Sequence, residues 1–203
     1  GPMAMAASLG TAFLKTNQRL ETPDIQFHIQ PFSADKPSDG SHPFSAFTAS
    51  VLQLRPESTG HLELRSANPS DHPAIHPSYL ATTTDCDTIV AGIKVARTVC
   101  ATEPVKSLII DEHSPGPSVG ADDNEAILNW ARNTATTIYH PTGTCKMGSD
   151  KMAVVNDRLQ VHGIEGLRVA DASIMPTITS GNTNAPAIMI GEKASEMVLK
   201  EAV

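Results

Sequence analysis

The chain has 203 residues, of which 40% are hydrophobic and 18% charged, and its 22 acidic and 15 basic residues give a formal net charge of −7. This composition is typical of a globular protein, and the scattered Lys and Arg residues argue against a nucleic-acid partner. The three cysteines are too widely spaced for a CxxC zinc pair or a disulfide framework, and no apolar run reaches the ~20 residues of a membrane span. Because the N-terminus also lacks a basic signal-peptide region, we expect a soluble, cytoplasmic protein.

The first half of the chain predicts an antiparallel sheet. Residues 24–30 alternate apolar and polar side chains, which indicates a half-buried strand with His28 on the face opposite the apolar one. Residues 31–43 are rich in Pro, Ser, Asp and Gly and indicate a loop. Residues 44–54 and 61–65 are further strand candidates, and the PESTG turn between them predicts that they pair as a hairpin.

Residues 68–79 contain three prolines and two histidines and are predicted to be extended and irregular. His72 and His76 have the i, i+4 spacing of a metal pair, but that spacing faces one ion only on a helix. Pro73 and Pro77 argue against a helix here, so we expect no metal site.

Helices are predicted after residue 82. Apolar residues recur at helical spacing in residues 83–101, and Thr84 or Asp85 is the expected N-cap. Residues 122–133 indicate a second helix with acidic residues near its N-terminus, and a long terminal helix is expected from residue 184 onward. Strands followed by helices predict an α+β fold, in which helices cover one side of an antiparallel sheet.

Two segments carry residues suited to chemistry. His140 lies in the sequence TIYHPTGTCKMG, and its imidazole either takes a proton from an alcohol or is a buried ring that holds backbone groups. Residues 171–185 follow a short strand candidate at 167–170 and lead into the terminal helix. Asn182 and Asn184 there either bind a polarised ligand atom or cap the helix.

A hydrolase is a further hypothesis for the same residues. Cys145 could be a nucleophile activated by His140, although no peptidase signature accompanies it. Ser173 lacks the G-x-S-x-G elbow that positions a serine nucleophile. Both hydrolase readings predict covalent labelling by an active-site probe.

The two segments form one ordered pattern. YHPTGTCKMG at residues 139–148, followed by the sequence VVNDRLQVHGIEGLRVADASIMPTITSGNTNAPAIMIGEKA at 154–194, resembles the C-terminal part of glucose-methanol-choline (GMC) flavoprotein oxidoreductases. Residues 47–80 are similar to the substrate-domain region of the choline dehydrogenase-like branch. The resemblance implies a substrate-binding domain at 1–136, and at 137–203 the catalytic motifs and a segment that would complete a flavin-binding domain.

The resemblance also implies roles for single residues. His140 matches the base that removes the hydroxyl proton while hydride passes from the alcohol carbon to flavin N5, and Asn182 matches the residue that shares the substrate oxygen. His28 matches a substrate-side histidine of choline-oxidising relatives. The residues that the resemblance places beside FAD are Tyr139, Asp171, Ala172, Thr183, Asn184 and Ala185.

One family element is absent from the sequence: no GxGxxG turn of a dinucleotide-binding domain occurs in the 203 residues. The resemblance therefore predicts the C-terminal portion of an enzyme that oxidises a primary alcohol to an aldehyde. We expect it to bind FAD weakly or not at all without the missing N-terminal FAD domain, and to expose surface that favours homo-oligomers. The alternative is a non-catalytic binding or interaction module that has the substrate-domain fold without flavin.

Overall fold

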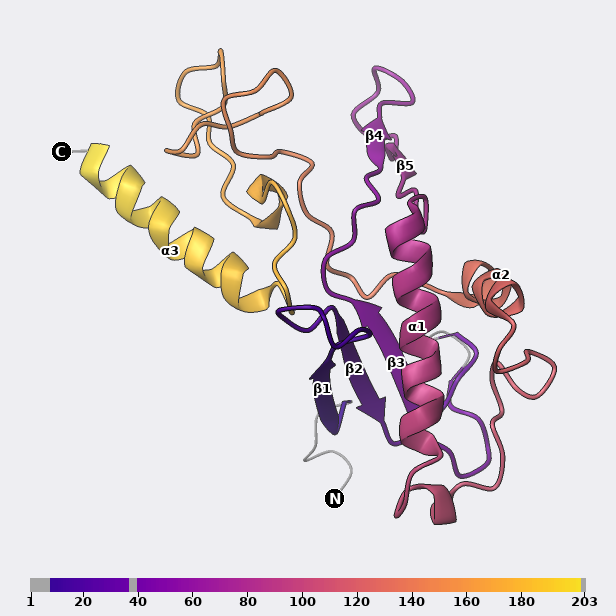
Figure 1. Cartoon of the computed structure of the whole chain (residues 1–203). Helices are drawn as coiled ribbons and strands as arrows, with labels where there is room; N and C mark the ends of the chain where they lie inside the picture. Colours follow the sequence, from indigo (N-terminus) through magenta and orange to yellow (C-terminus); the bar gives the residue numbers. More distant parts are fainter. Residues whose placement is uncertain (1–7, 37–39, 202–203) are drawn as a thin grey trace. The chain divides into compact units, whose positions relative to one another are not determined.

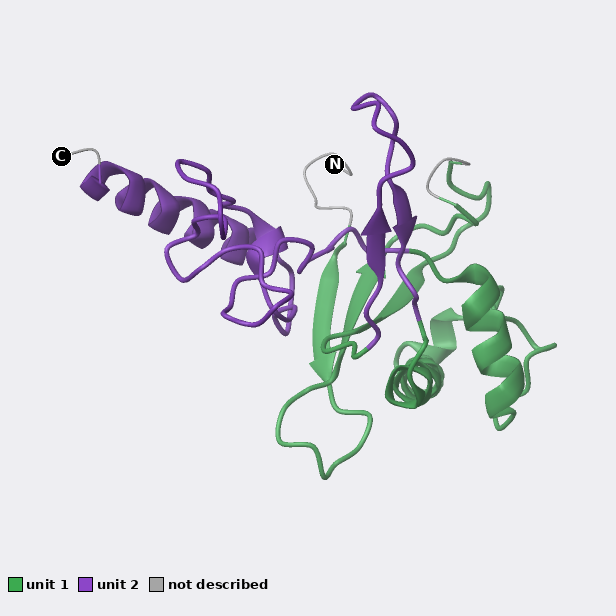
Figure 2. Ribbon diagram, turned by 90° about the horizontal axis from the view of Figure 1, so that it is seen from above, with its two compact units in different colours: residues 1–57, 80–136 green, residues 58–79, 137–203 purple. Residues whose placement is uncertain are grey.

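The structure of the protein is a computed structural model that describes residues 8–36 and 40–201 (Figure 1). The chain divides into two compact units, which are residues 1–57 with 80–136 (unit 1) and residues 58–79 with 137–203 (unit 2) (Figure 2). The predicted domain limit at residue 136 is also a limit between units, but the structure assigns residues 58–79 to unit 2. The assignment of functions to these parts stays a prediction.

Unit 1 contains an antiparallel sheet, as predicted. Its strands are β1 (Gly10–Leu14), β2 (Ile25–Gln30) and β3 (Thr48–Gln53), in the order β1-β2-β3. The strand predicted at 24–30 is confirmed as β2, whereas the sequence analysis predicted no strand at β1. The alternation of Thr11, Ala12 and Phe13 is too short and too weakly apolar to distinguish a strand by period alone.

The predicted hairpin between residues 44–54 and 61–65 is wrong. The strand β3 pairs with β2 along its whole length, while β4 (His61–Glu63) pairs with β5 (Ala74–His76) in unit 2. The β3 strand has buried and half-buried side chains that fit the apolar β2 strand, but every residue of β4 is exposed. Burial therefore decided the pairing over the local turn signal.

The two faces of this sheet differ in what covers them. On one face, Ile25 and Val51 pack against helix α1 (Thr83–Cys100), where a Cβ on Gly92 would lie 2.6 Å from Val51 Cγ1. His28 lies on the other face, opposite Ser50 in the strand register. Gln26 also lies on that face and is only 3% exposed, so the face is not simply a solvent face as the alternation predicted.

Helices α1 and α2 (Asn124–Thr134) form the apolar core of unit 1 together with β3. The buried residues of this core are Val90, Ile93, Ile127 and Ala131. The N-cap of α1 is Thr82 rather than Thr84 or Asp85, because the Thr82 hydroxyl accepts the backbone N–H of Asp85 at 3.2 Å. The Asp123 carboxylate caps α2 in the same way through the N–H of Ala126.

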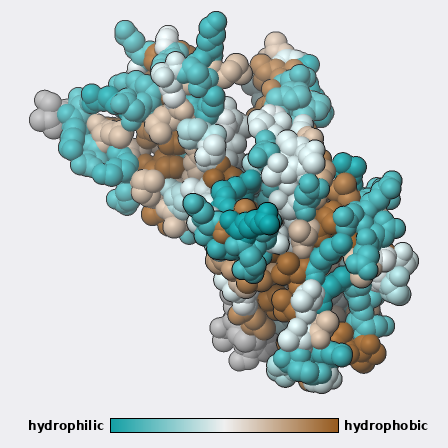
Figure 3. Space-filling model, viewed as in Figure 1, coloured by the Kyte–Doolittle hydropathy of each residue, from teal (hydrophilic) through white to brown (hydrophobic). Residues whose placement is uncertain are grey.

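Large apolar side chains also remain exposed in unit 1, and Figure 3 shows apolar areas on the visible face. Phe13 is 45% exposed, Leu108 in the short helix η3 (Lys106–Leu108) is 83% exposed, and Ile110 is 99% exposed. Exposed apolar side chains of this size are typical of surfaces that pack against another protein segment. Among the described residues, no helix is both long and apolar enough to cross a membrane.

Unit 2 combines the β4–β5 hairpin with a turn-rich segment, the short helix η4 (Ala172–Ile174) and the terminal helix α3 (Asn184–Glu201). Its buried core residues are Val155, Leu159, Ile174, Met175, Ile190 and Ala194. The carboxylate of Glu201, at the end of α3, pairs with the guanidinium groups of Arg158 and Arg168. Packing and these ion pairs hold α3 against the segment that precedes it.

Two predictions for unit 2 need correction. The segment predicted to be irregular, 68–79, contains β5, because a three-residue strand fits between the prolines at 73 and 77. The predicted strand at 167–170 has only an isolated bridge between Gln160 and Arg168. Turns interrupt the chain there too often for a continuous strand ladder to form.

The start of α1 is fixed to the sheet by a buried carboxylate. Asp85 is 1% exposed, and its Oδ1 accepts hydrogen bonds from the Gln53 side chain at 2.8 Å and from the Glu57 backbone N–H at 2.9 Å. Such charge-assisted bonds are stronger than neutral ones, and removing the acceptor would break both of these part-buried bonds. Asp85 thus joins α1, β3 and the segment after β3.

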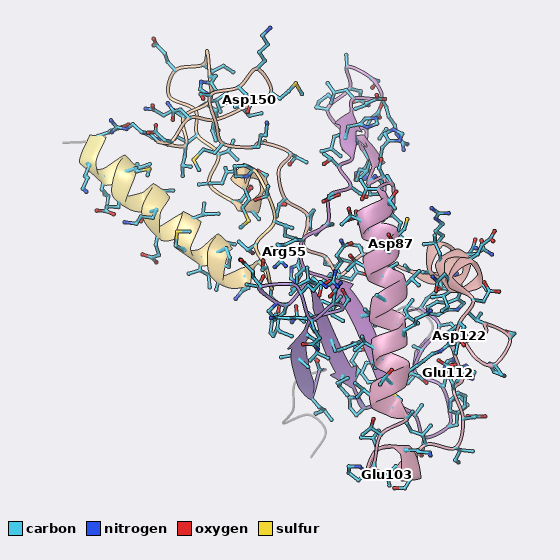
Figure 4. All side chains as sticks on the ribbon, in the orientation of Figure 1. Arg55, Asp87, Glu103, Glu112, Asp122 and Asp150 are labelled. Atoms are coloured by element: carbon cyan, nitrogen blue, oxygen red, sulfur yellow. The ribbon has the colours of Figure 1, made fainter. Side chains whose placement is uncertain are left out.

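We predict that Asp85→Ala lowers the free energy of unfolding by about 2–3 kcal/mol, because two part-buried hydrogen bonds to a buried carboxylate are lost. Asp87→Ala is the matched control on the same helix (Figure 4), since Asp87 is exposed, and it should change stability by less than about 0.5 kcal/mol. Denaturant unfolding followed by circular dichroism measures both. Equal losses in the two variants would contradict the role of Asp85.

Candidate active site

Two side chains of unit 2 contact the ring of His140. The Asn182 amide Nδ2 lies 3.0 Å from His140 Nε2, and the Thr183 hydroxyl lies 2.8 Å from His140 Nδ1. Both ring nitrogens therefore have a polar partner from the loop that precedes α3. The structure brings together the residues predicted as base and hydroxyl partner, although they are 42 positions apart.

Backbone pairing holds the His140 segment beside this loop. The N–H of Cys145 donates to the Ser173 carbonyl at 3.0 Å, and the N–H of Met147 donates to the Ile174 carbonyl at 2.7 Å. Gly143 has a φ of +85°, a backbone conformation that residues other than glycine adopt only with strain. A Cβ added to Gly143 would lie 3.4 Å from the carbonyl oxygen of Met175. The turn at Gly143 thus allows the chain after His140 to run against η4.

Thr183 is the buried anchor of the cluster. It is 7% exposed, whereas Asn182 is exposed and His140 is half-buried. The Thr183 carbonyl accepts the N–H of Ala187 at 2.9 Å, so its backbone is part of the first turn of α3. A hydroxyl fixed in this way gives the imidazole one defined orientation.

The hydrogen bonds also select a ring tautomer for His140. The amide nitrogen of Asn182 can only donate, so His140 Nε2 is the acceptor in this arrangement. In the neutral ring the proton then lies on Nδ1, which donates it to Thr183 Oγ1. The lone pair of Nε2 is on the side of Asn182, where a hydroxyl proton could be taken.

The other predicted flavin-side residues lie around the same loop. Asp171 accepts the Ser173 N–H at 2.8 Å, and hydrogen bonds from the Ser173 hydroxyl and backbone hold the pKa of the Asp171 carboxyl below its ordinary value. Tyr139 precedes His140 with a φ of +64° and is 71% exposed. Asn184 and Ala185 are exposed at the start of α3, and Ala172 packs on the core of unit 2.

Two sequence hypotheses fare differently in this geometry. His28 belongs to β2 in unit 1, whereas the other predicted site residues belong to unit 2, so its substrate-side role stays a prediction. The ring nitrogens of His140 bond Asn182 and Thr183 rather than the Cys145 thiol, which gives no support to a cysteine nucleophile.

Sequence reasoning missed the contact between Thr183 and His140. The resemblance assigned Thr183 to the flavin side, and only the fold shows that its hydroxyl holds the imidazole. The available signal was that Thr183, which has a hydroxyl side chain, directly follows Asn182 in the sequence. Threonine is common at helix starts for capping alone, so this signal was weak.

Comparison with known proteins identifies the family. The model of the GMC oxidoreductase C-terminal region matches residues 56–191, which is more than half of the chain. The chain therefore belongs to the GMC oxidoreductase family.

Curated relatives of the chain oxidise alcohols according to their names. It is 41% identical over 189 residues to an alcohol dehydrogenase [acceptor] of Pseudomonas putida, which covers 93% of this chain and 34% of that protein. It is 42% identical over 188 residues to mitochondrial choline dehydrogenase of Mus musculus, which covers 92% of this chain and 31% of that protein. The chain spans about a third of the length of these relatives.

Solved structures give the same family. A pyridoxine 4-oxidase from Mesorbium loti matches 94% of this chain and 37% of its own, with a TM-score of 0.83 and 25% sequence identity. A formate oxidase variant of Aspergillus oryzae RIB40, made to study FAD modification, matches 90% of this chain and 32% of its own, with a TM-score of 0.79 and 26% identity. These neighbours confirm the α+β fold with its antiparallel strands.

The residues present suit one edge of a flavin rather than the whole cofactor. The first N–H groups of an α-helix have no acceptor within the helix, so the start of α3 at Asn184 and Ala185 offers donors to the carbonyl oxygens of a flavin ring. His140 and Asn182 lie in the same loop region. The sequence offers no glycine-rich turn for the pyrophosphate, so the fit is limited to the ring.

We predict that Thr183→Val releases the Nδ1 side of His140, because valine has nearly the same shape but cannot accept the ring proton. The preference for the Nδ1–H tautomer should fall by about 1 kcal/mol, the net value of one hydrogen bond. Nitrogen-15 shifts of the His140 ring, measured by NMR, report the tautomer directly. Thr183→Ser keeps the hydroxyl and should keep the tautomer, and a tautomer unaffected by valine would contradict the anchoring role.

Proposed function

We propose that this chain is the substrate-side part of an FAD-dependent enzyme that oxidises a primary alcohol to an aldehyde. The observation that carries the proposal is the pair formed by His140 Nε2 and Asn182 Nδ2, a proton acceptor and a proton donor 3.0 Å apart. The family and the names of the relatives support an alcohol as the substrate class.

The spacing of this pair suits a hydroxyl group. The one lone pair of Nε2 accepts the Asn182 N–H in the structure, so a substrate hydroxyl would take the place of that bond and lie between the two nitrogens. It would donate its proton to His140 Nε2 and accept a bond from the Asn182 amide. Asn182 is a poor base, because an amide does not take up a proton near neutral pH, so the proton transfer falls to His140.

Thr183 is a positioning residue in this scheme. When His140 has taken the hydroxyl proton, both ring nitrogens carry protons, and the Nδ1 proton still has Thr183 Oγ1 as its acceptor. The anchor thus serves the neutral and the protonated ring without a change of orientation. FAD, when bound, would supply the hydride acceptor, and Tyr139, Asp171 and the start of α3 are proposed to contact its ring.

The proposal includes a second part of the enzyme that binds the phosphates of FAD. Much of the affinity for FAD comes from bonds to its phosphates, and the sequence lacks the turn that makes them. The chain spans about a third of its curated relatives, and apolar side chains such as Ile110 are exposed. We therefore propose that an FAD-binding domain covers part of this surface and completes the enzyme. The three free thiols support the proposed cytoplasmic location.

We predict that the purified chain retains little flavin after incubation with FAD and removal of free ligand, because the phosphates lack their main binding site. The measurement is the visible absorption band of bound flavin near ~450 nm. Co-expression with the remaining two thirds or so of the Pseudomonas putida relative should restore the band. A chain that holds FAD alone in equimolar amount would overturn this part of the proposal.

In such a flavin-loaded complex, His140→Ala should lower kcat for a primary alcohol by about 10³-fold, since general base catalysis contributes about 10²–10⁴-fold. Asn182→Ala should lower kcat by about ten- to a hundredfold, because the reacting hydroxyl loses a hydrogen bond of roughly 1.4–3 kcal/mol. His72→Ala, at an exposed position away from His140 in the sequence, is the control and should leave the rate unchanged. Full activity in both site variants would contradict the roles given to His140 and Asn182, whereas a flavin-loaded complex that oxidises no alcohol would favour a non-catalytic binding module.

A further inference from the structure

A second group of chemically active side chains lies on the β4–β5 hairpin of unit 2. The strand register places His61 directly opposite His76. Glu63 follows His61 by two residues along β4, so its side chain points to the same face of the hairpin. Two imidazoles and one carboxylate therefore project from one side of a two-stranded ribbon.

The three side chains converge. The rings of His61 and His76 are stacked with centroids 4.5 Å apart and an interplanar angle of 17°. The Glu63 carboxylate lies beside both rings, with Oε1 3.3 Å from His61 Nε2 and Oε2 4.0 Å from His76 Nε2. One ligand atom from each residue lies within 4.8 Å of the other two.

We propose that this group, which we call the hairpin site, binds a divalent transition-metal ion of the zinc class. Imidazole nitrogen and carboxylate oxygen are ligands of Zn²⁺, at bond lengths of about 2.0–2.2 Å. Ligand atoms around a tetrahedral ion at that length lie roughly 3.3–3.5 Å apart. The two stacked rings would have to rotate out of their parallel arrangement, because each imidazole lone pair lies in the plane of its ring and both must point at the ion. The side chains of His61, Glu63 and His76 are 59%, 63% and 49% exposed, which leaves them free to make these rotations.

The backbone, rather than the rings, fixes the distance between the two histidines. A Cβ on Gly60 would lie 2.0 Å from the carbonyl oxygen of His76, so a glycine is required for β4 to start this close to β5. The pairing of β4 with β5 therefore places His61 opposite His76. The sequence suggested only His72 as a partner for His76, and Pro73 and Pro77 argued against that pair; in the strand register, His61 lies opposite His76.

A second cluster of histidine and acidic side chains lies in unit 1 and is a weaker candidate for a metal site. Asp35, His42 and His113 also have ligand atoms within 4.8 Å of one another. The His42 ring is already committed, because Nδ1 bonds the Ser33 hydroxyl at 2.9 Å and Nε2 lies 3.5 Å from Asp35 Oδ2. Its ring also stacks on Phe44. A metal would have to displace these contacts, so this group serves as a comparison for the hairpin site.

Metal binding at the hairpin site would stabilise a weak element. An isolated two-stranded hairpin is marginally stable in water, and β4 and β5 have three residues each. An ion shared by both strands links residues 61 and 76 and fixes their register, so part of the binding free energy becomes folding free energy of the hairpin. This role is structural and does not depend on alcohol oxidation.

The test is a titration of the whole 203-residue chain with ZnCl₂, measured by isothermal titration calorimetry. The visible absorption spectrum of the chain loaded with Co²⁺ in place of Zn²⁺ is a second readout of the ligand set. We expect one equivalent of Zn²⁺ to bind with a Kd in the micromolar range, about 1–100 μM. His61→Gln and His76→Gln should each weaken binding at least about tenfold, and Glu63→Gln should weaken it less. Zn²⁺ should also slow amide hydrogen exchange in residues 61–63 and 74–76.

Two controls separate the hairpin site from other ligands on the chain. His72→Gln removes a neighbouring histidine outside the site, and His42→Gln removes the central residue of the unit 1 group; both should keep the Kd within about twofold. Unchanged zinc binding in the His61 and His76 variants would overturn the proposal, as would a loss in the His42 variant alone, or a wild-type Kd above about 1 mM. Circular dichroism confirms that each variant is folded. Because the readout is zinc and not turnover, failure here leaves the proposed oxidoreductase function untouched.

Discussion

The bond between the Thr183 hydroxyl and His140 Nδ1 is the constraint on which the candidate active site depends. This bond joins the segment that carries His140 to the start of the terminal helix. Because Thr183 is buried, its hydroxyl gives the imidazole one orientation. The exposed Asn182 amide can then approach Nε2 on the other side of the ring. Without the anchor, an imidazole on a loop would sample several rotamers, and the proton acceptor would have no fixed direction.

The rest of unit 2 keeps the two ends of this bond in place. Backbone hydrogen bonds from Cys145 and Met147 to η4 bring the His140 segment alongside the loop, and the apolar core under α3 fixes the helix that Thr183 begins. At the far end of α3, Glu201 pairs with Arg158 and Arg168, which ties the helix to the turn-rich segment. The site thus lies at the start of a helix whose position is fixed by an apolar core and by ion pairs.

The two proposals use different parts of one unit. In the proposed function, His140 takes the hydroxyl proton and Asn182 holds the hydroxyl oxygen, next to the start of α3, where helix N–H groups would favour the carbonyl oxygens of a flavin. The hairpin site consists of exposed side chains on a short ribbon, where a metal would fix the strand register. Histidine serves in both places because its neutral ring is a good proton acceptor and a good metal ligand. The neighbouring side chains decide between the two roles, and they are an amide at His140 and a carboxylate with a second imidazole at the hairpin site.

The amino-acid sequence by itself determined the elements with a strong period and the residues with a specific motif. The β2 strand, the three long helices, and the pairing of His140 with Asn182 through the family pattern all followed from it. Only the tertiary structure decided which strands pair, because β3 joins β2 through buried side chains and the turn signal before β4 is local. The Thr183 anchor and the convergence of His61 with His76 also needed the fold, since contacts between distant residues depend on how the chain returns on itself.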